Sequence, residues 1–177
     1  KFAQVVVATN KNSVKYATCG TGKNFWCVWR EQSLDWQDKL LDQYVVGREI
    51  TEQDRNIASL LDPTRLLTLS KYFVLYDANI KKICRYQQFF AVEEIIKTIQ
   101  QNDSAGNRQG GVIWHTQGSG KSLTMVMVAK YILMEMSRFN PRVVIVTDRK
   151  ELDKQIAKTF AHTRLSPARA TSGKHLI

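Results

Sequence analysis

The segment HTQGSGKS, at residues 115–122, constrains the fold of this chain more than any other. It follows a short apolar run, 111–114, that is typical of a buried strand. After it, residues 121–136 are apolar nearly all round, which predicts a buried helix. A strand, a glycine-rich loop and a helix in this order are typical of a phosphate-binding loop, because a helix N-terminus favours anions.

The loop carries the residue types that nucleotide phosphates require. Gly118 and Gly120 allow backbone N–H groups to turn inward without a Cβ clash. Lys121 can reach the β- and γ-phosphates, and Ser122 can ligate Mg²⁺. His115 stands where the general pattern has its first glycine. These residues predict ATP and Mg²⁺ as cofactors, with Lys121 as the catalytic lysine.

A second octet, ATCGTGKN at residues 17–24, has the same glycine and lysine spacing. Its last residue, Asn24, is a poor magnesium ligand, and the aromatic stretch 25–29 that follows favours a strand rather than a helix. Two glycines before such a stretch predict a hairpin. The sequence therefore predicts one phosphate loop in this chain, at 115–122.

The C-terminal half alternates between helical and strand patterns. Apolar residues recur at helical spacing over 92–99, and strands are expected at 111–114 and 143–146. The second of these is an uninterrupted β-branched run, which is typical of a parallel strand that is covered on both faces. With helices at 121–136 and 152–160, the fold class predicted is α/β, with a parallel sheet beside the P-loop.

Three regions are expected along the chain. Residues 1–33 are β-like, 34–80 form a mostly helical connector, and 81–177 form the N-terminal part of the α/β domain. Within the connector, Asp62 as N-cap and Pro63 at the first helical position predict the start of a helix.

Charge and cysteine usage narrow the class of protein. The net charge is +10, and only the connector has an acidic excess. The basic charge favours a polyanion such as DNA as partner, but it also fits a solvated basic surface. Cys19, Cys27 and Cys84 lack metal-ligand spacing and are expected to be reduced thiols of a cytosolic protein. No apolar run is long enough for a membrane span.

Other polar residues are candidates for ligand contact. The Gln88 amide could pair with adenine, or could belong to a solvated helix start. Asp148 and Glu151 predict a capping box for the last helix. Arg149 and Lys150 follow the second expected parallel strand, at the edge of the sheet where ligands collect, so they could contact DNA phosphates or remain solvated.

Three stretches together resemble the restriction (motor) subunit of type I restriction–modification enzymes. They are RYQQFFAVEEI at 85–95, GGVIWHTQGSGKSLTM at 110–125 and PRVVIVTDRKELDKQI at 141–156. The resemblance implies a superfamily 2 helicase-like motor of two RecA-like domains, which hydrolyses ATP to translocate along double-stranded DNA. It also implies a cytoplasmic location, and methyltransferase and specificity subunits as partners.

The resemblance assigns roles to individual residues. Gln88 matches the adenine-contacting motif, and Thr171–Ser172–Gly173 falls near a further DNA-facing motif. Asp148 and Arg149 lie in the motif after the second core strand, near the DNA path of such motors. The Walker A loop corresponds to Thr116, Gln117, Gly118, Ser119, Gly120, Lys121 and Ser122.

The resemblance also implies parts that this sequence lacks. Residues 1–33 match the C-terminal tail of an endonuclease domain, whose catalytic carboxylates are expected before Lys1. The Walker B motif and the second RecA-like domain are expected after Ile177, so the segment alone is expected to be inactive. Two alternatives stay open: a superfamily 2 translocase without nuclease activity, and a non-catalytic DNA-binding module.

Overall fold

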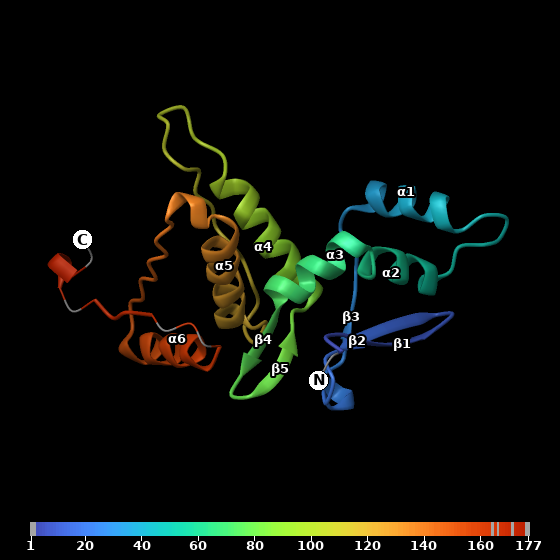
Figure 1. Ribbon diagram of the computed structural model, residues 1–177, viewed down its shortest axis with the longest axis horizontal. Helices are drawn as coiled ribbons and strands as arrows, with labels where there is room; N and C mark the ends of the chain where they lie inside the picture. Colours follow the sequence, from blue (N-terminus) through green and yellow to red (C-terminus); the bar gives the residue numbers. More distant parts are fainter. Residues whose placement is uncertain (1–2, 164, 166, 171, 176–177) are drawn as a thin grey trace.

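The computed structural model describes residues 3–163, 165, 167–170 and 172–175. A small sheet and two helices lie at one end of the molecule, three longer helices and a hairpin lie at the other, and helix α3 lies between them (Figure 1). No helix among the described residues is long and apolar enough to cross a bilayer.

The N-terminal sheet is antiparallel, with strand order β1-β2-β3. Its strands are β1 (Val6–Asn10), β2 (Ser13–Ala17) and β3 (Cys27–Val28). In β2, Val14 and Tyr16 are buried while Ser13 and Lys15 are exposed, as the alternation of residue types predicts. The octet 17–24 begins at the last residue of β2 and continues into the connection to β3, which pairs antiparallel with β2, so the predicted hairpin is confirmed.

Three helices follow: α1 (Leu34–Tyr44), α2 (Glu52–Leu60) and α3 (Pro63–Thr68). The predicted start of α3 is confirmed, because the Asp62 carboxylate accepts a hydrogen bond of 2.9 Å from the Arg65 N–H. A π-helical turn, Leu69–Phe73, leads from α3 into strand β4 (Val74–Asp77).

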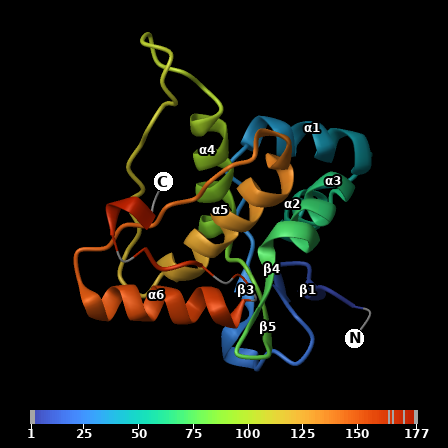
Figure 2. The same ribbon diagram turned by 60° about the vertical axis from the view of Figure 1, so that its left-hand side comes forward.

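The C-terminal half contains one hairpin and three long helices. Strands β4 (Val74–Asp77) and β5 (Ile80–Ile83) pair antiparallel, and the expected region boundary at residue 80 falls within this hairpin. Helices α4 (Tyr86–Ile99), α5 (Lys121–Glu135) and α6 (Lys150–His162) follow, and α5 packs against both of the others (Figure 2).

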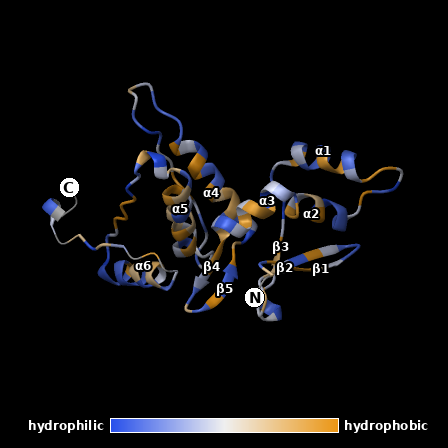
Figure 3. Ribbon diagram, viewed as in Figure 1, coloured by the Kyte–Doolittle hydropathy of each residue, from blue (hydrophilic) through white to orange (hydrophobic). Residues whose placement is uncertain are grey.

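The predicted parallel sheet is absent from the described residues, in which both sheets are antiparallel. Residues 111–114 and 143–146 are extended but unpaired, and Val112, Trp114 and Val146 are 89%, 91% and 87% exposed. A strand needs a neighbour for its backbone groups, and within the described residues neither stretch belongs to a sheet. The apolar colour of the second stretch, before α6, is visible in Figure 3.

Two predictions about helices, the burial of α5 and the cap of α6, need correction. Helix α5 is only partly buried, since Met125, Leu133 and Met134 are exposed where no sheet covers them. The N-cap of α6 is Arg149, and no side chain caps this helix, so the capping box expected from Asp148 is wrong. Asp148 instead forms an exposed ion pair with Arg149.

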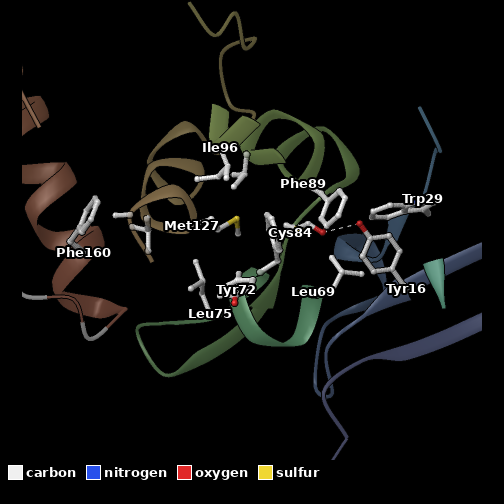
Figure 4. Packing of buried hydrophobic residues seen from close by; sticks show 14 of the residues in the cluster. Tyr16, Trp29, Leu69, Tyr72, Leu75, Cys84, Phe89, Ile96, Met127 and Phe160 are labelled. Carbon is white, nitrogen blue, oxygen red and sulfur yellow. Dashed lines mark hydrogen bonds between the residues drawn. The ribbon is translucent and has the colours of Figure 1, made fainter. Parts of the chain in front are cut away.

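One continuous apolar core joins the two ends of the molecule (Figure 4). It extends from Tyr16 on β2 and Trp29 just after β3, through Phe89 on α4 and Met127 on α5, to Phe160 on α6. The Tyr16 hydroxyl donates a buried hydrogen bond of 2.8 Å to the Cys84 carbonyl, and burial raises the pKa of this hydroxyl.

We expect Tyr16→Phe to lower the free energy of unfolding by about 1–3 kcal/mol, because the buried Cys84 carbonyl loses its donor. Urea denaturation followed by circular dichroism measures this change. Tyr44→Phe is the matched control, since Tyr44 is 63% exposed, and it should alter stability by less than about 0.5 kcal/mol. Equal effects of the two substitutions would contradict the importance of the Tyr16 bond.

Candidate nucleotide-binding site

The loop before α5 has the backbone conformation that its glycines permit. Gly118 and Gly120 have φ of +76° and +85°, in the left-handed region that other residues rarely adopt. Gly120 is also the N-cap of α5, where it supplies no side chain. The sequence thus places glycine where the chain must turn sharply into the helix.

A second constraint on Gly120 comes from α4. A Cβ at this position would lie 2.8 Å from the Gln88 Nε2 atom, which is closer than real contacts allow. The Gln88 side chain is packed there because its Nε2 donates hydrogen bonds to the Gly120 carbonyl (3.1 Å) and the Thr124 hydroxyl (3.3 Å). The φ of residue 120 therefore favours glycine, and a larger residue there would have to displace the Gln88 amide.

The Gln88 amide is fully engaged inside the protein. Its Oε1 accepts a hydrogen bond of 2.9 Å from the Arg85 N–H at the N-terminus of α4. Gln88 is 5% exposed, and both ends of its amide have protein partners. In this structure the amide thus holds the first turn of α4 against the end of the loop. Thr124, which receives one of these bonds, was not identified from the sequence.

The Lys121 ammonium folds back on its own loop. Its Nζ donates to the carbonyls of His115 (2.5 Å) and Thr116 (3.0 Å). An ammonium group has three donors and no acceptor, so it binds oxygen atoms, which here are two carbonyls of the loop. Phosphate oxygens offer a stronger, charge-assisted partner than these neutral carbonyls do.

The start of α5 is open to an anion. The helix has 15 residues, no acidic residue in its first turn and no side-chain cap, so its first N–H groups keep their donor capacity. Ser122 lies within this first turn. Among the described residues, the Ser119 hydroxyl is the buried side-chain group that lacks a hydrogen-bond partner. A buried hydroxyl without a partner costs stability, which a polar ligand in the loop would recover.

The remaining loop residues lie at the surface. Thr116 and Gln117 are exposed, and the Ser119 N–H donates to the Thr116 carbonyl at 3.3 Å, which closes the turn. The structure thus brings the predicted loop, residues 116–122, together with Gln88. The loop N–H groups and the Lys121 ammonium are hydrogen-bond donors, which is the chemistry that phosphate oxygens require.

An apolar cavity of about 350 Å³ lies beside the loop. His115 and Lys121 border it on the loop side, and Met125, Val128 and Ile145 are among its apolar walls. Because these walls offer few hydrogen-bond donors, the cavity does not suit phosphate groups. The loop and the N-terminus of α5 are the chemically suitable place for them.

The predicted DNA contacts are exposed and lightly constrained. The Arg149 guanidinium lies 3.6 Å from the Asp148 carboxylate, with both side chains 77% exposed, and such a pair contributes little stability. Lys150 is exposed at the first residue of α6. Of the further expected DNA-facing motif, Thr171 lies outside the described residues, while Ser172 and Gly173 are exposed.

Comparison with known proteins assigns the class. Residues 87–177, just over half of the chain, match the family model described as SWI2/SNF2 ATPase, and the chain belongs to this family. Curated relatives are type I restriction enzyme endonuclease subunits, in agreement with the sequence resemblance.

Three relatives illustrate the match. The HindI endonuclease subunit of Haemophilus influenzae is 41% identical over 67% of this chain and 11% of its own length. The SauCOLORF180P subunit of Staphylococcus aureus is 36% identical over 90% of this chain and 16% of its own length. The SsaAORF53P subunit of Staphylococcus saprophyticus is 29% identical over the same shares. The chain thus spans 11–16% of these relatives.

We expect Gly120→Ala to lower the melting temperature by several degrees, because about 1–2 kcal/mol of left-handed strain adds to a clash with Gln88. Gly106→Ala is the matched control, since Gly106 has a similar φ of +81° but nothing within 4 Å of its Cβ position. Differential scanning calorimetry measures both variants. Adding Gln88→Ala to Gly120→Ala should recover part of the loss, and no recovery would contradict the clash.

Proposed function

We propose that this chain is the ATP-binding part of the motor in the endonuclease subunit of a type I restriction enzyme. The observation that carries the proposal is the loop at the start of α5, with a positive φ at Gly120 and an unpartnered buried hydroxyl on Ser119. The SWI2/SNF2 ATPase match and the endonuclease relatives support this assignment.

The chain's own residues would act on bound ATP mainly by holding charge. Lys121 would exchange the carbonyls of His115 and Thr116 for phosphate oxygens, and the first N–H groups of α5 would donate to the same anion. The Ser122 hydroxyl would ligate Mg²⁺. When bound, magnesium–ATP supplies the phosphoryl group whose transfer to water releases free energy for movement along DNA.

We propose two roles for Gln88, which its amide cannot perform at the same time. In this structure it holds Gly120, and that geometry supports a role in shaping the loop. Contact with adenine, which the resemblance implies, would require the amide to exchange its bonds to Gly120 and Thr124 for bonds to the base.

Double-stranded DNA and the methyltransferase and specificity subunits are the proposed partners. The basic net charge and the exposed Arg149 and Lys150 support DNA binding near the start of α6. The proposed regions are an endonuclease tail at 1–33, a connector at 34–80 and the beginning of a RecA-like domain at 81–177.

A translocase without nuclease activity is the second candidate, because the matched family is described only as an ATPase. Plasmid cleavage by the intact protein, with its partner subunits, separates the two. Cleavage that requires ATP supports the restriction enzyme, and ATP hydrolysis without cleavage supports the translocase.

We expect Lys121→Ala in the intact protein to lower DNA-stimulated ATP hydrolysis by at least about 100-fold, because the charge held on the phosphates is lost. DNA binding should be nearly unchanged. Lys97→Ala is the control, since the Lys97 side chain is 69% exposed at the end of α4. A phosphate-release assay and a DNA filter-binding assay measure the two activities. Unchanged hydrolysis in Lys121→Ala would favour a non-catalytic DNA-binding module.

We expect Arg149→Gln with Lys150→Gln to weaken DNA binding and to lower the slope of log affinity against log salt by about 1.8, since each phosphate contact contributes about 0.9. Fluorescence anisotropy with duplex DNA over a salt series measures this slope. Lys11→Gln with Lys15→Gln removes the same charge from the N-terminal sheet and should leave the slope nearly unchanged. Equal losses in both variants would indicate a general charge effect.

A further inference from the structure

Four aromatic rings from separate parts of the chain surround the guanidinium of Arg65 on α3. Its Cζ lies 4.3 Å from the ring centroid of Trp36 and 5.3 Å from that of Trp29. The rings of Phe89 and Phe90, on the first turns of α4, lie at 5.2 Å and 5.5 Å. Such distances allow cation–π attraction on several sides of one charge. Here these rings, Arg65 and Glu31 are called the Arg65 cluster.

Glu31 fixes this charge in place. Its carboxylate accepts hydrogen bonds from Arg65 and from the Trp29 indole N–H on one oxygen, and from the backbone N–H groups of Gln32 and Ser33 on the other. The Glu31 side chain is 1% exposed and that of Arg65 is 10% exposed. The Glu31 carboxylate has partners on both oxygens, and its pair with Arg65 joins the segment after the N-terminal sheet to α3.

The Arg65 cluster adjoins the residue that holds the phosphate loop. Phe89 and Phe90 follow Gln88 directly, and successive residues of a helix leave its axis about 100° apart. One turn of α4 therefore contacts Arg65 on one side and reaches the Gly120 carbonyl with Gln88 on another. A shift of this turn at the Arg65 cluster must move the Gln88 amide relative to Gly120.

We propose that Arg65 is a positioning residue, which acts through Phe89 and Phe90 to hold Gln88 against Gly120 and so sets the nucleotide affinity of the loop. The inference rests on the proposed ATP binding. According to this inference, the N-terminal sheet and the connector influence the nucleotide affinity of the loop, although neither supplies a phosphate ligand. By linkage, nucleotide binding would act back on the Arg65 cluster to the same extent.

The test is a double-mutant cycle on the intact protein, with the affinity for a fluorescent methylanthraniloyl-ATP as readout. Arg65→Lys keeps the charge opposite Glu31 but loses the planar fork and its stacking on the rings. We expect it to weaken nucleotide binding about fivefold to tenfold when Gln88 is present, and less than about twofold in a Gln88→Ala background. Phe90→Leu, which keeps the ion pair intact, should show the same dependence on Gln88.

The control is Arg48→Lys. Arg48 forms a two-pronged ion pair with Asp54 in the same helical connector, and it also donates to the Glu49 carbonyl, which lies outside α4. It should change affinity less than about twofold in either background. Circular dichroism at the assay temperature confirms that each variant is folded.

Two outcomes overturn the inference. One is an unchanged affinity in Arg65→Lys and Phe90→Leu, and the other is a loss of the same size with and without Gln88, which indicates general destabilisation. Lys121→Ala distinguishes these from failure of the proposed function. If Lys121→Ala binds the nucleotide as the unmodified protein does, the proposed function fails, and the inference fails with it. If Lys121→Ala loses binding while Arg65→Lys has the same effect with and without Gln88, only the inference is overturned.

Discussion

A single side-chain amide, that of Gln88, ties the first turn of α4 to the last residue of the glycine-rich loop. Its three hydrogen bonds, with Arg85, Gly120 and Thr124, use both the oxygen and the nitrogen of the amide inside the protein. The position of the loop therefore depends on the position of α4. Because Gly120 begins α5, the same bonds also set how α4 and α5 meet, and these two helices carry much of the core.

The N-terminal sheet and the helical connector are joined to this core by polar groups as well as apolar ones. Tyr16 donates to the Cys84 carbonyl, next to the start of α4, and Arg65 pairs with Glu31 among aromatic rings from both halves. Removal of one partner of such a buried pair typically costs about 3–5 kcal/mol, since the other charge stays buried without compensation. The two ends of the chain are thus expected to unfold together rather than as independent modules.

Much of the local structure could be predicted from the sequence. Three features depend mainly on residues that are neighbours in the sequence, so the sequence pattern predicts them. They are the hairpin at 17–24, the cap of α3 by Asp62 and the helix that begins at Lys121. The parallel sheet could not be obtained in this way. The β-branched stretch 143–146 has the composition of a buried strand, but a strand also needs a partner in register, and within the described residues none is present.

For the candidate site, the sequence by itself determined which residues form the loop, because the order of glycine, lysine and serine before an apolar helix is a local requirement of phosphate binding. Only the tertiary structure decided what surrounds that loop. The contact between Gln88 and Gly120 joins residues 32 positions apart, and the pair of Arg65 with Glu31 joins residues 34 apart. Such contacts depend on how helices pack, and packing is a property of the whole core rather than of any one segment.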